Sequence, residues 1–256
     1  EAQQLGYAEA DPTLDVGGFD AAHKLALLAS LAFGMPLQFD KIAIEGISSV
    51  KSIDFDLAER LGYAIKPLAV ARRQPSGTEL RDHPAPAPPS SLIARVDGAM
   101  NGILVGSDAA GITMHYGAGA GSEQTASAVI ADLIDIARLG PATGSEAVPS
   151  LGFQPEMLSE QPVVPAHGVV TRNYLRFPIA GDESIAAIEE TLAHHGIAVS
   201  ERIDVHGDGS LQGRQLALIT GPLRDDCVTG ALRAWQVRHG GQGTITRLRI
   251  EDLPQA

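Results

Sequence analysis

The sequence predicts an α+β protein in which a mixed β-sheet, covered by helices on one face, is followed by a ferredoxin-like domain. Three observations support this prediction. Residues 1–140 alternate short strands with three predicted helices, and residues 141–167 are proline-rich without any period. Residues 168–256 then follow the order strand, helix, strand, strand, helix, strand, which is the split βαβ arrangement. We therefore expect two domains joined by a linker that drapes over the surface.

In the first domain, a helix is predicted over residues 19–33, where apolar residues recur at helical spacing and Gly34 and Pro36 end the pattern. Asp54, near the start of another helix, favours the dipole of that helix. The proline-rich residues 83–89 are predicted to be loop or extended chain. Shorter patterns predict strands over 42–47 and 64–72, helices over 54–61 and 123–139, and a hairpin of strands 101–105 and 111–116 about Ser107 and Asp108.

In the second domain, Gly196 is expected to stop the first helix, and a Gly-Asp-Gly turn at residues 207–209 is expected between the middle strands. About 80 residues suffice for a small independent domain. The pattern predicts strands over 170–177, 197–206, 216–220 and 244–250, and helices over 182–195 and 224–238.

Composition excludes several classes of protein. The chain of 256 residues has 19 basic and 31 acidic side chains and a net charge of −12, which argues against nucleic acid or an anionic membrane as a partner. There is no apolar run of 18 residues and no signal-peptide pattern at the N-terminus. Cys227 is the single cysteine and cannot form an internal disulfide. We expect a cytoplasmic protein.

The first candidate for chemistry is Asp20 with Lys24, because residues four apart share one face of a helix. A carboxylate can orient an ammonium, and a lysine in a dry cleft can donate or accept a proton. The alternative is an ordinary surface ion pair. A second candidate is an acidic set that needs a shared cation, unless it is simply a solvated loop. Its members are Glu9, Asp11, Asp15 and Asp20.

A third candidate is the glycine run at residues 117–121, between a strand and a helix. Its glycines permit close approach of the backbone to a ligand, although a tight turn alone explains them equally well. The histidines suggest little: His194 and His195 are expected to cap a helix, and His23 to point away from Lys24. No His or Cys spacing matches a zinc site, and no metal site is predicted.

Taken together, residues 1–140 resemble homoserine dehydrogenase. The resemblance rests on residues 6–12, Asp15, residues 20–25, 39–41, 45–47, 61–66, 101–103, 116–121 and 125–129. The remaining residues resemble an ACT regulatory domain. This family reduces aspartate semialdehyde to homoserine with NADP or NAD, on the route to threonine and methionine. The resemblance further implies a homodimer or homotetramer, an amino-acid effector at the ACT-like domain and, as a further candidate, a monovalent cation.

The resemblance implies a role for each candidate residue. Lys24 is the proton donor to the carbonyl oxygen, and Asp20 places Lys24 and the substrate hydroxyl. Glu9 holds the substrate ammonium, with Asp15 in support. Gly117, Gly119 and Gly121 approach the nicotinamide. An amino-acid substrate brings the cation that the acidic loop needs.

The sequence departs from the family pattern in three respects. Gln124 stands where the family has proline, and residues 181–185 replace the Gly-Val that follows the first strand of an ACT domain. No GxGxxG cofactor-binding domain is present, and the chain does not begin with Met. We therefore expect a piece of a longer enzyme that is inactive alone. The alternatives are an amino-acid-sensing ACT module on a catalytically incomplete core, or a structural dimerisation piece.

Overall fold

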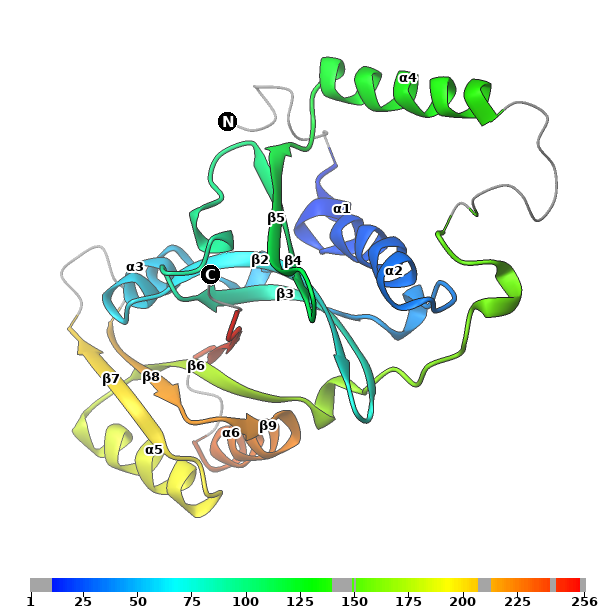
Figure 1. The fold of residues 1–256 in the computed structure, drawn as a ribbon. Helices are drawn as coiled ribbons and strands as arrows, with labels where there is room; N and C mark the ends of the chain where they lie inside the picture. Colours follow the sequence, from blue (N-terminus) through cyan, green and yellow to red (C-terminus); the bar gives the residue numbers. More distant parts are fainter. Residues whose placement is uncertain (1–10, 140–148, 150, 207–212, 240–242, 254–256) are drawn as a thin grey trace.

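The computed structural model describes residues 11–256 except 140–148, 150, 207–212, 240–242 and 254–256. Two sheets lie one above the other (Figure 1). The upper one belongs to the first half of the chain and the lower one to the second half. Within the described residues, no helix is both long enough and apolar enough to cross a bilayer.

The upper sheet is mixed, as predicted. Its order is β1-β3-β2, from β1 (Ala43–Ile44), β2 (Ala64–Gln74) and β3 (Gly77–Ala87). Strand β1 runs parallel to β3, and β2 pairs with β3 as an antiparallel hairpin. Helix α2 (Phe19–Phe33) covers one face and buries Ala22 and Leu25 in a cluster with Leu80 of β3. Both ends of α2 are glycines in the left-handed conformation, which explains why its bounds agree with the prediction.

Residues 83–89 are extended chain and loop, as predicted. Residues 83–87 are the second half of strand β3, which begins at Gly77 and which the sequence analysis did not detect, and residues 88–89 follow its end. Proline cannot donate a ladder hydrogen bond, so it is tolerated in a strand where its nitrogen has no partner to supply. Pro86 still uses its carbonyl, which accepts a hydrogen bond from the amide of Glu251 at 3.2 Å. Pro84 and Pro86 therefore lie within a strand.

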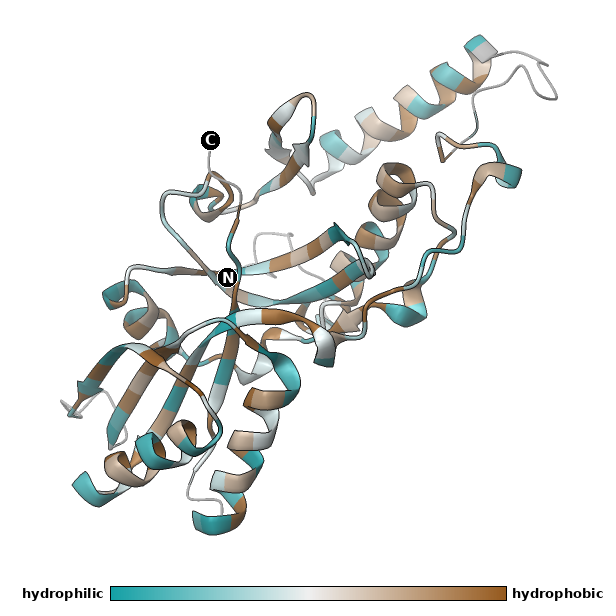
Figure 2. Ribbon diagram, turned by 60° about the horizontal axis from the view of Figure 1, so that its bottom comes forward, coloured by the Kyte–Doolittle hydropathy of each residue, from teal (hydrophilic) through white to brown (hydrophobic). Residues whose placement is uncertain are grey.

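A separate two-stranded hairpin and a long helix complete the first half. Strands β4 (Met100–Ser107) and β5 (Gly111–Ala118) pair across the predicted turn, and helix α4 (Ser122–Leu139) follows. Figure 2 shows apolar residues recurring along α4, although the helix stands apart from the sheets. Its exposed apolar residues are Val129, Ile130, Leu133, Ile134 and Ile136.

The lower sheet has the strand order β10-β6-β8-β7, with every pair antiparallel. This is the ferredoxin-like order that the split βαβ pattern predicted. The predicted turn at residues 207–209 lies outside the described residues. The elements are β6 (Val170–Ile179), α5 (Asp182–His194), β7 (Val199–Val205), β8 (Arg214–Thr220), the short β9 (Leu223–Arg224), α6 (Asp225–His239) and β10 (Thr246–Ile250).

The two faces of the lower sheet pack against different parts of the chain. Along β6, Leu175 and Phe177 face α5 and α6, and Tyr174 faces the other way. On that other face lies helix α3 (Ser52–Arg60), which buries Leu57 in the same cluster as Tyr174. One hydrophobic cluster therefore contains residues from both halves of the chain.

A buried ion pair reinforces this contact. Asp54 of α3 is fully buried and accepts hydrogen bonds from Arg176 Nε at 2.6 Å and Tyr174 Oη at 3.0 Å. It also accepts the amide of Lys51 at 2.9 Å, as expected of an acidic residue in the first turn of a helix. Burial and the Asp54 charge raise the pKa of Tyr174 well above its usual range. Asp54 thus stabilises the start of its own helix and also binds side chains of the second half.

Residues 159–164 of the proline-rich segment lie along the edge of the upper sheet. Thr78 donates its amide to the Pro162 carbonyl and accepts the Val164 amide, each at 2.8 Å. The amide of Ser159 donates to the carbonyl of Gly34 at 3.0 Å, at the end of α2. These contacts fasten the segment to the surface of the first half.

Candidate functional site

The candidate site lies at the corner between helix α1 (Thr13–Val16) and helix α2. Asp11 opens this corner by accepting hydrogen bonds from the hydroxyl of Thr13 at 2.5 Å and from its amide at 3.1 Å. These bonds hold the pKa of the Asp11 carboxyl below its usual value. Gly18 then turns the chain with φ at +82°, a conformation that favours glycine. The corner is thus built from the local chemistry of the sequence.

The structure brings Asp20 and Lys24 together. Lys24 Nζ lies 2.6 Å from Asp20 Oδ2, on the face of α2 opposite its buried residues. The side chains are 47% exposed for Asp20 and 65% for Lys24, so the pair contributes little to stability. One carboxylate oxygen holds the ammonium, which has three hydrogen-bond donors. The remaining donors are available to an oxygen of a ligand.

The other members of the acidic set fall in different places. Asp15 is exposed on α1, before the corner. Glu9 lies outside the described residues. His23 stacks on the ring of Phe39 at 4.3 Å and so points away from Lys24, as expected. In the described part of the chain, no group of three or more His, Cys, Asp or Glu side chains has the arrangement of a metal site.

The corner also covers a buried carboxyl group that the sequence analysis missed. Asp82 of β3 is 3% exposed, and its Oδ2 would lie 2.2 Å from a Cβ placed on Gly18. Gly18 is therefore required both by its backbone conformation and by Asp82. Burial raises the pKa of Asp82 to about 6, against the lowering influence of His83. No sequence pattern distinguishes such an aspartate from an exposed one.

The glycine run follows the end of β5 and precedes α4. Gly117 has open space where a side chain would stand. A Cβ on Gly119 would meet Asn101 Nδ2 at 2.0 Å, and one on Gly121 would meet Gln124 Oε1 at 2.3 Å. Gly119 is thus explained by close packing against Asn101 and Gly121 by its φ of +124°, whereas Gly117 leaves space for a ligand. In the described part of the chain, no hydrogen bond or ion pair joins the run to α2.

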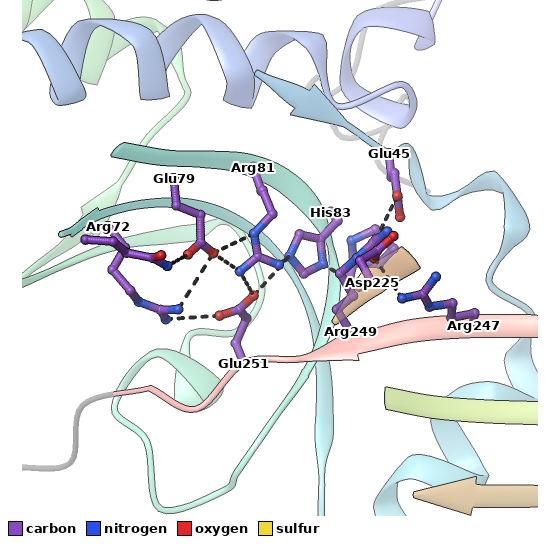
Figure 3. A network of polar contacts seen from close by, with 11 residues as sticks. Glu45, Arg72, Glu79, Arg81, His83, Asp225, Arg247, Arg249 and Glu251 are labelled. Atoms are coloured by element: carbon purple, nitrogen blue, oxygen red, sulfur yellow. Dashed lines mark hydrogen bonds and ion pairs between the residues drawn. The ribbon is translucent and has the colours of Figure 1, made fainter. Parts of the chain in front are cut away.

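A network of polar contacts lies between the two sheets, and the sequence analysis missed it (Figure 3). Glu251, just after β10, is held by Arg81 Nη2 at 2.7 Å, His83 Nε2 at 3.1 Å and Arg72 Nη2 at 3.2 Å. Burial acts to raise the pKa of Glu251, but these partners outweigh it and lower that pKa to about 2. Glu79, Arg81 and His83 alternate along β3, but Asp82 interrupts the pattern with a further polar residue, so the sequence contains no clear signal of this buried polar face.

The profile of the family "Homoserine dehydrogenase" matches residues 1–134. Homoserine dehydrogenase of Pseudomonas aeruginosa is 44% identical over 254 residues, and that of Neisseria gonorrhoeae is 42% identical over 255 residues. Each alignment covers 99% of this chain and 58% of the relative.

Solved structures of homoserine dehydrogenases are also similar to this chain. A homoserine dehydrogenase from Thiobacillus denitrificans matches 98% of this chain with a TM-score of 0.87 and 45% identity, and 57% of that structure is covered. The Staphylococcus aureus enzyme, at 24% identity and a TM-score of 0.70, shares the fold. This chain therefore spans somewhat more than half the length of these relatives, and it belongs to the homoserine dehydrogenase family.

Proposed function

We propose that this chain supplies the substrate-binding and proton-transfer groups of a homoserine dehydrogenase, which interconverts aspartate 4-semialdehyde and homoserine. The observation that carries the proposal is the Lys24–Asp20 pair, at 2.6 Å on an accessible helix face. Family membership supports it, because the relatives carry this enzyme name.

The chemistry assigned to the pair is a proton transfer. When bound, a nicotinamide cofactor supplies the hydride that reaches the carbonyl carbon. The carbonyl oxygen then gains an electron pair and takes a proton from Lys24 Nζ, which yields the hydroxyl of homoserine. Asp20 holds the ammonium in position before the transfer. In the reverse direction, neutral Lys24 accepts the proton from the same hydroxyl.

Other residues take the substrate and cofactor in this proposal. Asp15 and Glu9 hold the ammonium of the amino acid, because carboxylates are the natural partners of that cation. Gly117 lies where the backbone leaves room for a flat ring, with Gly119 and Gly121 shaping the turn. NADP or NAD is the cofactor, and a monovalent cation is a further candidate ligand.

The remaining proposals concern an effector, the oligomeric state and the cellular compartment. The ferredoxin-like half binds an amino-acid effector in the manner of an ACT domain, which its strand order supports. The protein works as a homodimer or homotetramer. The lone cysteine supports the cytoplasm as its compartment.

The test of the proton-transfer role is Lys24→Ala. In a homoserine dehydrogenase of full family length that contains this chain, we expect kcat to fall about 10²- to 10⁴-fold, the usual loss of a general acid. Lys41→Ala is the matched control, because Lys41 is also exposed and pairs with Gln38 outside the corner. A kcat within a few-fold of wild type in Lys24→Ala would refute the role.

A second candidate function is an amino-acid sensor built on an incomplete core, which the ferredoxin-like strand order favours. Calorimetric titration of the isolated chain separates the two. The proposed enzyme site binds homoserine and loses binding in Asp20→Ala. A sensor binds an amino acid such as threonine with an affinity that Asp20→Ala leaves unchanged.

A further inference from the structure

Two guanidinium groups of the second half share one buried carboxylate. Asp225, the first residue of α6, accepts Arg249 Nε at 2.6 Å and Arg247 Nη2 at 2.7 Å on the same oxygen. All three side chains are largely buried. Taken alone, this cluster carries one more positive charge than negative charge. A buried excess charge is costly unless a further carboxylate compensates it.

Glu45 of the first half supplies that carboxylate. Its Oε1 lies 2.7 Å from Arg249 Nη1, directly after strand β1 (Figure 3). Burial opposes the charge of Arg249, yet Glu45 and Asp225 hold the pKa of that guanidinium above its usual value. Glu45 lies at the edge of the cluster, and its side chain is about half exposed. The pair therefore joins β1 of the upper sheet to β10 of the lower sheet.

Ile44 and Gly46, on either side of Glu45, lie against the α1–α2 corner. We call these residues, together with Asp82, the seat of the corner. A Cβ on Gly46 would lie 2.4 Å from the carbonyl oxygen of Val16, so the two backbones are in direct contact. The side chains of Ile44 and Asp82 lie against Gly18, at 3.2 Å and 2.2 Å from a Cβ placed there. The amide of Glu45 donates to the carbonyl of Asp82 at 2.8 Å, which ties the seat together. The main chain at Glu45 is therefore linked directly to the residues that contact the corner.

We propose that Glu45 is a positioning residue, which lets the ferredoxin-like half hold the α1–α2 corner, and with it Asp20 and Lys24, through the Glu45–Arg249 ion pair. The effect on ligand binding rests on the proposed function. The effect on the corner itself does not, because it follows from the contacts of the seat. The inference assigns the second half a direct part in shaping the substrate site.

Hydrogen exchange measures the corner without any ligand. The amides of Val16, Gly17 and Ala22 donate to the carbonyls of Pro12, Thr13 and Gly18. In Glu45→Ala we expect these amides to exchange about tenfold faster, the size of losing one charge-assisted hydrogen bond. The amide of Gly34, at the other end of α2, keeps its rate. Glu45→Gln, which retains an acceptor for Arg249, restores part of the protection.

The matched control is Glu189→Ala. Glu189 is 44% exposed, against 49% for Glu45, and it pairs with Arg202 at 2.6 Å within the second half. We expect this variant to leave the corner amides unchanged. Arg249→Met reproduces the effect of Glu45→Ala, and the double variant exchanges no faster than Glu45→Ala alone. If Arg249→Met does not fold, the comparison of Glu45→Ala with Glu45→Gln and Glu189→Ala still decides.

Calorimetry with homoserine adds the functional readout. We expect Kd to rise about tenfold in Glu45→Ala, less in Glu45→Gln, and not in Glu189→Ala. Unchanged exchange at the corner in Glu45→Ala, or equal acceleration in Glu189→Ala, overturns the inference. If wild type binds no homoserine, the binding site proposed above fails, and the exchange data alone decide the role of Glu45.

Discussion

At the scale of single residues, Asp82 shows how burial changes the behaviour of a common side chain. It lies on the same face of β3 as Leu80, beneath the start of α2, where a carboxyl group is shielded from water. Asp54 is buried as well, but it is compensated by Arg176. The sequence analysis assigned Asp54 to the start of its helix correctly, and its cross-chain partner was beyond any local pattern.

Asp82 predicts a specific pH dependence of stability. In the folded chain its pKa is about 6, against 3.8 for the model compound that represents the unfolded chain. Between these values the folded state binds more protons, so this group lowers the free energy of unfolding as pH rises. Asp82→Asn removes that loss, and we expect it to gain roughly 1–3 kcal/mol relative to wild type between pH 4 and pH 7.

Urea unfolding at several pH values measures this difference. Asp56→Asn is the control, because Asp56 is an exposed aspartate on α3. A difference between Asp82→Asn and wild type that does not change with pH would contradict the assigned pKa. Glu251 contributes the opposite slope at lower pH, because its pKa of about 2 makes its stabilisation disappear as pH falls below 4.5.

At the scale of elements, glycines at the ends of a helix were the most dependable signal of its bounds. Helix α2 has the predicted bounds because Gly18 and Gly34 adopt conformations that other residues avoid. Strand β3 was missed because prolines are depleted in strands. Here the prolines are tolerated, because β1 pairs with only two residues of β3. Short-range signals are therefore reliable where the backbone itself is constrained, and weak where a neighbouring strand decides.

Gly34→Ala tests the contact between α2 and the proline-rich segment. Gly34 has φ at +62°, and an added Cβ would lie 3.0 Å from the ring of Phe153. Gly62 has φ at +78° with nothing within 4 Å, so Gly62→Ala reports the backbone cost alone. We expect about 1–2 kcal/mol of destabilisation in Gly62→Ala and roughly 1 kcal/mol more in Gly34→Ala. Equal losses in thermal unfolding would show that Phe153 moves aside without cost.

At the scale of the whole molecule, the two halves share a hydrophobic cluster rather than only a covalent link. Leu57 of α3 packs on the lower sheet, and the Asp54–Arg176 pair is buried beside it. The charged cluster around Glu251 fills the region between the sheets. Such contacts predict that the second half unfolds together with α3.

Leu57→Ala tests this coupling from a distance. Trp235 is the single tryptophan and lies on the α5–α6 side of the lower sheet, so its fluorescence reports the second half. We expect Leu57→Ala to cost about 2–5 kcal/mol and to lower the midpoints of the fluorescence and circular dichroism transitions together. Leu133→Ala, at an exposed position on α4, should shift neither. An unchanged fluorescence midpoint in Leu57→Ala would indicate that the halves unfold independently.

The sequence by itself determined the α+β class, the order of elements in the second half, the bounds of α2 and the pairing of Asp20 with Lys24. These features follow from periodicity, glycine conformation and helical spacing, which act over a few residues. Only the tertiary structure decided the burial of Asp82, the partner of Asp54 and the contact of Glu45 with Arg249. These depend on residues far apart in the chain, because solvent exclusion and charge compensation arise only when separate elements pack together.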